Sequence, residues 1–260
     1  NSIHWKSYDA DGSIWFEEIL SFQEIQDNTI TTESVKATLI KILQVANTMN
    51  SNVFNNSEGF AVTTQLSFPR NWGLGTSSTL INNIAQWFQI DAFELLHQSF
   101  GGSGYDIACA QNNTPITYSI VNGDPKIEQV VFDSAFTKNL YFVYLNQKRN
   151  SKSAIAEYHT NKTKQLSSYI AAINTLTQDI IEANNLELFT QLISQHETVL
   201  SKILKTETVK DTLFPDFDGA VKSLGAWGGD FVLVVSKENP IPYFVAKGYE
   251  TVIPYGEMIL

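Results

Sequence analysis

The stretch Pro69-Arg70-Asn71-Trp72-Gly73-Leu74-Gly75-Thr76-Ser77-Ser78 holds the most informative pattern in this chain. Its two glycines let backbone N–H groups turn toward a ligand and approach it closely. Three hydroxyl residues follow at the expected start of a helix, where unpaired N–H groups favour an anion. The stretch therefore predicts a phosphate-binding loop, but it lacks the Gly-Lys-Ser/Thr of a Walker loop. An ordinary glycine turn with a Ser or Thr helix cap stays open as the alternative.

Two further glycine-rich stretches extend this pattern along the chain. Gly101-Gly102-Ser103-Gly104-Tyr105-Asp106 places one carboxylate after three glycines, where it could orient or deprotonate a substrate hydroxyl or help to bind a metal. Gly225-Ala226-Trp227-Gly228-Gly229-Asp230 lies between two apolar segments, with Lys222 near enough to add positive charge. The alternatives are a solvated loop with Asp106 as a helix cap, and a plain strand–turn–strand connection.

Composition limits the classes of function. The chain has 260 residues, 43% of them hydrophobic, which is enough for a large folded core. A formal net charge of −10 argues against nucleic-acid binding, whose affinity rests on Lys and Arg at phosphates. No apolar run reaches the roughly 18 residues of a membrane span, so no membrane partner is expected. The single Cys109 excludes an internal disulfide and fits a reducing, cytoplasmic compartment.

Hydrophobic periodicity predicts a mixture of helices and strands. A hairpin is expected around Asp11-Gly12, and a helix is expected to open at Thr32-Glu33. Further strands are expected at residues 59–68, 116–121, 128–132, 140–145, 219–224, 231–235 and 251–253. Further helices are expected at residues 77–88, from Asp91 through His97, at 106–110, from about 153 to 205 with a break at Asn184-Asn185, and at 242–247.

Strands and helices without a regular βαβ alternation indicate an α+β fold. A shift in composition predicts a boundary near residue 135 and hence two domains, 1–135 and 136–260. The chain begins at Asn1, without Met and already in strand-like sequence, so we expect a segment upstream of it. A homodimer is compatible with the sequence, although no feature demonstrates one.

The three stretches, in this order, resemble the motifs of the GHMP small-molecule kinases. Pro69-x-x-x-Gly73-Leu74-Gly75-Thr76-Ser77 is similar to the family's Pro-x-x-x-Gly-Leu-Gly-Ser-Ser loop. Gly102-Ser103-Gly104-Tyr105-Asp106-Ile107-Ala108 is similar to a segment of phosphomevalonate kinases and of a bacterial subgroup named for Gly-Tyr-Asp-Ile-Ala. Lys222 to Asp230 resembles the C-terminal Gly-Ala-Gly-Gly-Gly-Asp motif, with Trp227 in place of a glycine.

The resemblance implies a two-domain fold, with a ribosomal-protein-S5-like N-terminal α/β domain and a ferredoxin-like C-terminal α+β domain with added helices. It also implies ATP and Mg²⁺ as cofactors and an N-terminal segment, absent here, that carries a Lys near the catalytic aspartate. By position, Asp106 would be the catalytic residue. The nucleotide phosphates would be held by Gly73, Leu74, Gly75, Thr76, Ser77 and Ser78. The metal would be held by Thr76, Ser77 and Glu94, and the acceptor by Ser103, Gly104, Lys222, Gly225, Gly228 and Gly229.

Three functions follow as hypotheses. The first is a kinase of the mevalonate pathway of isoprenoid biosynthesis, which phosphorylates mevalonate or phosphomevalonate. The second is another member of the family, namely a sugar or homoserine kinase or a diphosphomevalonate decarboxylase. The third is a nucleotide-binding protein without turnover, to which Trp227 and the spacing of Glu94 point. Lys148 and Arg149, if they reach the acceptor, favour a phosphorylated or carboxylated substrate.

Overall fold

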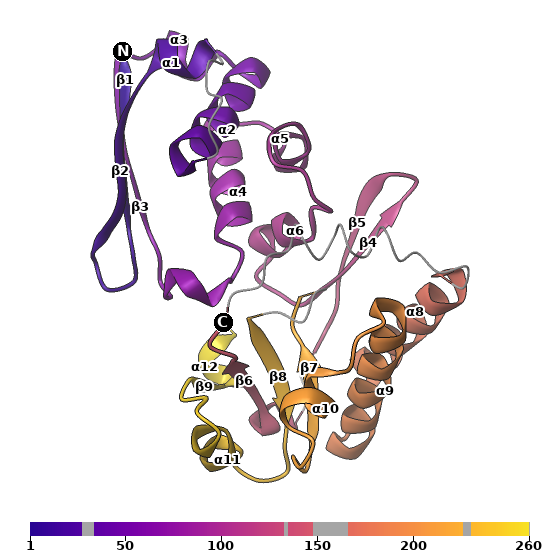
Figure 1. Ribbon diagram of the computed structural model, residues 1–260. Helices are drawn as coiled ribbons and strands as arrows, with labels where there is room; N and C mark the ends of the chain where they lie inside the picture. Colours follow the sequence, from indigo (N-terminus) through magenta and orange to yellow (C-terminus); the bar gives the residue numbers. More distant parts are fainter. Residues whose placement is uncertain (28–33, 133–134, 148–165, 226–229, 260) are drawn as a thin grey trace. The chain divides into compact units, whose positions relative to one another are not determined.

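The computed structural model describes residues 1–27, 34–132, 135–147, 166–225 and 230–259 (Figure 1). Its contacts divide the chain into two compact units. The N-terminal unit comprises Asn1–Arg70 and Leu74–Gln129, and the C-terminal unit comprises Asn71–Gly73 and Val130–Leu260. The division therefore passes twice through the first glycine stretch. The two expected domains, 1–135 and 136–260, stay a prediction.

The N-terminal unit is built on a three-stranded sheet in the order β2-β1-β3. Strands β1 (Ser2–Tyr8) and β2 (Ile14–Ser21) form the predicted antiparallel hairpin, and β3 (Gly59–Gln65) lies parallel to β1. Alternate residues of β1 are buried, as expected when one face of a sheet is covered. The predicted strand at 59–68 ends earlier, at Gln65.

A separate hairpin joins β4 (Ile116–Val121) to β5 (Asp124–Gln129). The expected strand at 128–132 was wrong, because the chain reverses earlier, at Asn122-Gly123. Both of these residues have positive φ, 55° and 96°, which is the conformation that a two-residue hairpin turn requires. The return strand therefore starts at Asp124.

Helices cover one side of the N-terminal sheet. They are α1 (Phe22–Gln26), α2 (Val35–Met49), α3 (Asn52–Asn55), α4 (Thr76–Phe88), α5 (Ala92–Ser99) and α6 (Tyr105–Gln111). The Ser34 hydroxyl caps α2 by accepting a hydrogen bond from the Ala37 N–H, and the expected helix start at Thr32-Glu33 lies outside the described residues. The apolar stripes of α2, α4 and α5 form one core with Ile3, Trp5 and Leu20, and α5 packs on α2 and α4. The short helices α1 and α3 were not predicted.

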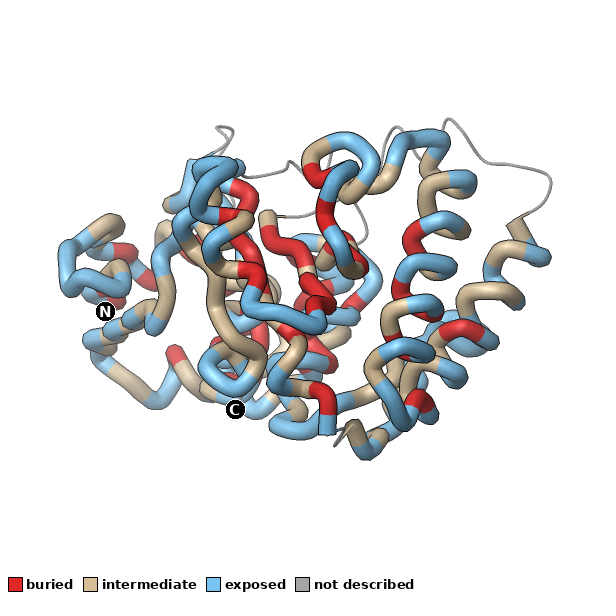
Figure 2. Tube along the Cα trace, turned by 90° about the horizontal axis from the view of Figure 1, so that it is seen from below, coloured by how far each residue is buried: buried red, intermediate tan, exposed pale blue. Residues whose placement is uncertain are grey.

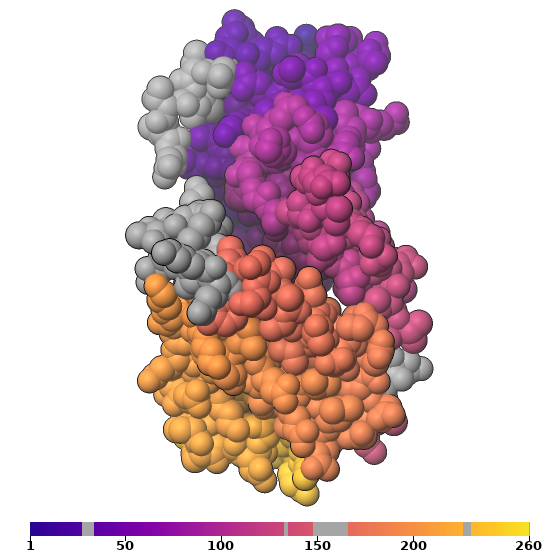
Figure 3. Space-filling model, turned by 90° about the vertical axis from the view of Figure 1, so that its right-hand side faces the viewer, coloured from indigo at the N-terminus to yellow at the C-terminus, as the bar shows by residue number. Residues whose placement is uncertain are grey.

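The C-terminal unit contains an antiparallel sheet in the order β7-β8-β6-β9. Its strands are β6 (Leu140–Tyr144), β7 (Ala220–Ser223), β8 (Phe231–Val235) and β9 (Val252–Pro254). Two helices lie on one side, α8 (Leu166–Glu182) and α9 (Leu186–Leu204), with the predicted break between them at Asn184-Asn185. Figure 3 shows the outer surface that these two helices give to the unit. The rest are α10 (Val209–Leu213), α11 (Ile241–Ala246) and α12 (Tyr255–Met258).

Two buried clusters lie on opposite faces of this sheet. Figure 2 colours the buried residues red along the chain. Ala220 packs with α8 and α9, whereas its neighbour Val221 packs with Phe214 and Phe244 on the other face. This alternation is what a strand covered on both faces requires. The unpredicted α10 and α12 are single-turn helices. No helix in the described ranges is long and apolar enough to cross a membrane.

Candidate functional site

The start of α4 has the features of an anion-binding helix terminus. Gly75 is its N-cap with φ 71°, and it makes no side-chain capping bond. The first-turn N–H groups, from Thr76 onward, therefore have no capping acceptor of the kind that Asp91 provides to α5. Thr76, Ser77 and Ser78 add three hydroxyls to this turn. The positive φ of Gly75 explains why glycine occurs there, and the Ser/Thr-cap alternative is wrong because Gly75 is the cap.

A cavity of about 450 Å³ adjoins this helix start inside the N-terminal unit. Thr76, Ser77 and Thr79 form one part of its wall. The Arg70 guanidinium lies 4.8 Å from the centre of the Trp15 ring at another part. The remaining lining comes from the sheet, from α2 and α4, from the segment after β3 and from the end of α5. It is mainly apolar: Trp5, Ser7, Phe16, Val35, Thr38, Leu39, Thr64, Gln65, Leu66, Ser67, Phe68, Leu80, Asn83 and Phe100. Hydroxyls at a helix start next to an aromatic-walled cavity suit a ligand with an anionic end and a flat apolar end.

The second glycine stretch leads into α6. Gly104 is the N-cap of that helix with φ 82°, so the alternative in which Asp106 caps it is wrong. A Cβ on Gly104 would lie 2.8 Å from Phe93 Cδ1, which leaves room only for glycine. The backbone of Ser103 is held in place by the Tyr118 hydroxyl, which donates a hydrogen bond to the Ser103 carbonyl.

Asp106 lies in the first turn of α6 and is exposed to solvent. Atoms packed around it still remove part of its hydration, and this raises the pKa of its carboxyl above the ordinary value. Burial raises the pKa of the neighbouring Tyr105 hydroxyl to about 12. Asp106 is thus a carboxylate at a helix start with increased proton affinity, which are properties of a general base.

The third glycine stretch connects β7 to its neighbour β8, and Gly225 has φ 75°. The strand–turn–strand alternative therefore describes its topology correctly. Trp227, Gly228 and Gly229 lie outside the described residues, as do Lys148 and Arg149.

The structure brings the first and third stretches together within the C-terminal unit. A Cβ built on Gly73 would lie 1.6 Å from Asp230 Oδ2, so the Asp230 carboxylate sits directly against the Gly73 backbone. Trp72 packs edge-on against Phe231, with ring centroids 5.3 Å apart. The sequence pattern identified both glycine stretches, but nothing in it indicated that Gly73 and Asp230 are in contact.

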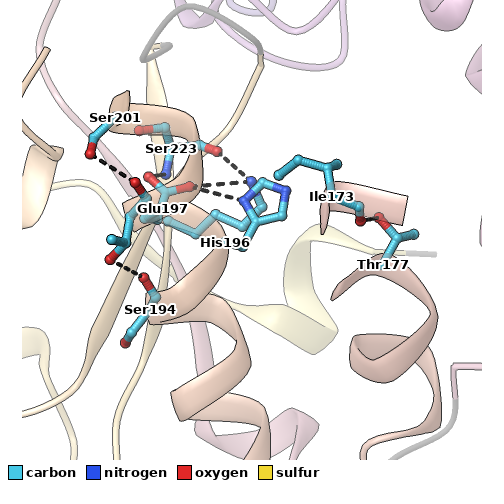
Figure 4. Close-up of polar contacts among 9 residues, drawn as sticks. Ile173, Thr177, Ser194, His196, Glu197, Ser201 and Ser223 are labelled. Carbon is cyan, nitrogen blue, oxygen red and sulfur yellow. Dashed lines mark hydrogen bonds and ion pairs between the residues drawn. The ribbon is translucent and has the colours of Figure 1, made fainter. Parts of the chain in front are cut away.

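Lys222 belongs to an ionic cluster around the buried Glu197. Figure 4 shows Glu197 in this cluster beside His196 and Ser223. The Lys222 ammonium lies 3.5 Å from Glu197 Oε1 and donates to the Ser223 carbonyl at 3.1 Å. Glu197 Oε2 accepts the Ser223 N–H at 2.9 Å, and Glu197 Oε1 lies 3.5 Å from His196 Nδ1. Burial lowers the pKa of Lys222, against the attraction of Glu197. Burial opposes ionisation of Glu197, but its contacts with His196, Lys222 and Ser223 hold its pKa below the ordinary value.

Sequence reasoning missed Glu197, although a signal was present. Phe189, Leu192 and Ile193 form the buried stripe of α9, and Glu197 continues it with a side chain that is only 6% exposed. A charged residue on an apolar stripe indicates a buried partner. The predicted acceptor contact Lys222 is that partner here.

The predicted metal ligand Glu94 lies on α5 and is exposed, and its carboxylate accepts a hydrogen bond from Gln98. It is not among the residues that line the cavity beside Thr76 and Ser77. Among the described residues, no three or more His, Cys, Asp and Glu side chains gather as a metal site. The hydroxyls of Thr76 and Ser77 suit a Mg²⁺ carried by phosphates, whereas the role of Glu94 stays a prediction.

The architecture that carries this site is the α+β fold of the GHMP kinases, in agreement with the sequence prediction. Mevalonate kinase from Methanococcus jannaschii has a similar structure, with a TM-score of 0.65 and 17% identity over 96% of this chain and 82% of that chain. Galactokinase from Lactococcus lactis, complexed with galactose, has a TM-score of 0.60 and 13% identity over 94% and 77%.

A mevalonate pyrophosphate decarboxylase from Streptococcus pyogenes is also similar, with a TM-score of 0.54 and 15% identity over 96% of this chain and 78% of that chain. No family model matches the sequence, and no curated protein matches it. The similarity is therefore one of fold, and it extends over nearly the whole chain.

Proposed function

We propose that this protein is an ATP- and Mg²⁺-dependent kinase that transfers the γ-phosphoryl group to a small alcohol or phosphate acceptor. The observation that carries the proposal is the uncapped start of α4 at the wall of the 450 Å³ cavity. Such a helix start binds phosphate through N–H groups that no other part of the helix can use. The aromatic wall supplies a surface on which a flat base can stack.

Within this proposal, residues Gly73 to Ser78 hold the nucleotide phosphates. Bound Mg²⁺ would neutralise charge on the transferred group, and the hydroxyls of Thr76 and Ser77 would hold the cation beside them. Asp106 orients the acceptor hydroxyl and accepts its proton. Ser103 and Gly104 hold the acceptor, whereas the acceptor contacts expected in the third stretch, Lys222, Gly225, Gly228 and Gly229, stay a prediction. Chemistry of this kind asks mainly for positioning and charge stabilisation.

We propose mevalonate and phosphomevalonate as the first acceptors to test. The reason is that the sequence from Gly102 to Ala108 resembles a segment of phosphomevalonate kinases. Another kinase or decarboxylase of the same fold is the second candidate, since the similar structures include a galactokinase and a decarboxylase. A nucleotide-binding protein without turnover is the third.

Release of ADP from Mg-ATP, measured with mevalonate, phosphomevalonate, diphosphomevalonate, homoserine and several sugars, tests the proposal. The chain should be assayed as given and with any native upstream segment restored. Turnover with either of the first two acceptors establishes the reaction and its substrate. Turnover with another acceptor retains the mechanism and rejects the substrate. ATP binding without turnover on any acceptor favours the non-catalytic candidate.

A further inference from the structure

The segment Asn71–Gly73, which precedes the start of α4, contacts the sheet of the C-terminal unit. The Asn71 carbonyl accepts a hydrogen bond from the Tyr144 hydroxyl at 3.1 Å. The Trp72 ring packs on Phe231 at 5.3 Å and on Tyr144 at 6.3 Å between ring centroids. Tyr144 and Phe231 are paired residues of β6 and β8, so both contacts come from one rigid place in the sheet.

The third contact of this segment is the closest. A Cβ at Gly73 would lie 1.6 Å from Asp230 Oδ2 and 2.6 Å from Asp230 Cγ. Asp230 is itself held in place, because its carbonyl accepts the Leu145 N–H at 2.8 Å directly after β6. The position of Gly73 is therefore set by a carboxylate whose own backbone is set by the sheet.

We infer that Asp230 is a positioning residue for the phosphate-binding loop, acting through its contact with Gly73. Gly73 and Gly75 have nearly equal φ, 70° and 71°, yet a Cβ on Gly75 meets no atom within 4 Å. The close approach of Asp230 is therefore specific to Gly73. This residue directly precedes Leu74 and, after it, the uncapped N–H groups of α4. Asp230 acts without touching the nucleotide, because it sets the position in space of Gly73, the first glycine of the loop.

This inference rests on the proposed function, because its effect is measured as the use of ATP. If a loop displacement of about 1 Å misplaces the phosphates, catalytic efficiency falls by up to about 100-fold. The effect should appear first in the KM for ATP, because the loop binds the nucleotide. Loss of stability alone would lower the amount of active protein and leave this KM unchanged.

The test is a double-mutant cycle with Gly73→Ala, Asp230→Ala and the two combined. Gly73→Ala should raise the KM for ATP about tenfold or more, because the new methyl group and Asp230 cannot both fit. Asp230→Ala removes the clashing atoms, so the double variant should recover most of that loss. Asp230→Ala alone should raise the KM for ATP severalfold, because Gly73 loses its support.

Gly248→Ala is the matched control for backbone strain. Gly248 lies in the same unit with φ 88°, and a Cβ there meets nothing within 4 Å. This variant should lose thermal stability through strain alone and keep the wild-type KM for ATP. A double variant no better than Gly73→Ala, or an Asp230→Ala variant with the wild-type KM, would overturn the inference.

Titration calorimetry with Mg-ATP separates the inference from the proposed function. If the wild-type chain binds ATP but phosphorylates no acceptor, the kinase proposal fails, and the same cycle of ATP affinities still decides the role of Asp230. If the wild-type chain does not bind ATP, both the kinase and the positioning role are contradicted.

Discussion

Asp106, which we propose as the residue that accepts the acceptor's proton, has a raised pKa. Its substitution should therefore lower turnover without lowering stability. Partial loss of hydration raises its pKa, so the native state binds this proton more tightly than the unfolded chain. Ionisation of Asp106 therefore lowers stability as the pH rises through the raised pKa, and this cost is fully present at neutral pH.

Asp106→Asn should lower turnover by roughly 10²–10⁴-fold, as loss of a general base or orienting group does. The same variant should be at least as stable as the wild type at pH 7, because it removes the cost of a poorly hydrated charge. Steady-state ADP release and urea denaturation measure the two effects, with exposed Asp124→Asn as the control. A variant with near-wild-type turnover would remove Asp106 from the mechanism.

Gly104 is constrained by backbone conformation and by packing, in addition to its place in the second glycine stretch. Its φ of 82° would cost an alanine about 1–2 kcal/mol, as would the 78° of Gly101. At Gly104 alone, a Cβ would also press on the Phe93 ring at 2.8 Å, which adds about 1–3 kcal/mol. Gly104→Ala should therefore lower the free energy of unfolding by more than Gly101→Ala in urea titrations. Equal losses would show that Phe93 yields without cost.

At the scale of elements, Glu197 couples helix α9 to the edge strand β7. Its carboxylate accepts the N–H of Ser223, which lies on an edge strand of the described sheet, and it neutralises Lys222. Glu197→Gln keeps the acceptor and removes the charge, so a poorly hydrated ammonium loses its partner. The variant should lower the free energy of unfolding at pH 7 by about 1–3 kcal/mol. Adding Lys222→Met should recover much of this loss.

The pH dependence distinguishes this pair from simple packing. Because the folded pKa of Glu197 lies below the ordinary value of 4.5, its stabilisation is complete above that pH and is lost as the pH falls through the folded pKa. The stability difference between the wild type and Glu197→Gln should shrink over that acidic range. Glu207→Gln, at an exposed glutamate, is the control. A constant difference would contradict the assigned role.

At the scale of the whole molecule, the position of the cavity predicts where a nucleotide slows hydrogen exchange. All residues that line the cavity belong to the N-terminal unit. Saturating Mg-ATP should therefore protect peptides that cover residues 5–16 and 64–80, relative to Mg²⁺ alone. It should also stabilise the chain by about 2.7 kcal/mol at 100 times the Kd. Protection confined to α8 and α9 would place the nucleotide elsewhere.

Much of the architecture followed from local patterns. The turn at Asp11-Gly12, the helix cap Asp91 and the break at Asn184-Asn185 each specify a conformation over a few residues, and the structure confirms all three. The errors were also local. Asn122-Gly123 went unrecognised as a hairpin turn, and the short helices α1, α3, α10 and α12 contain too few turns to show a period.

The sequence by itself determined the α+β class and the three glycine stretches, because periodicity and the conformational freedom of glycine act between near neighbours. Only the tertiary structure placed Asp230 against Gly73, paired Glu197 with Lys222, and enclosed a cavity beside Thr76 and Ser77. These contacts join residues far apart in the chain. Their geometry depends on how whole elements pack, and no local pattern encodes it.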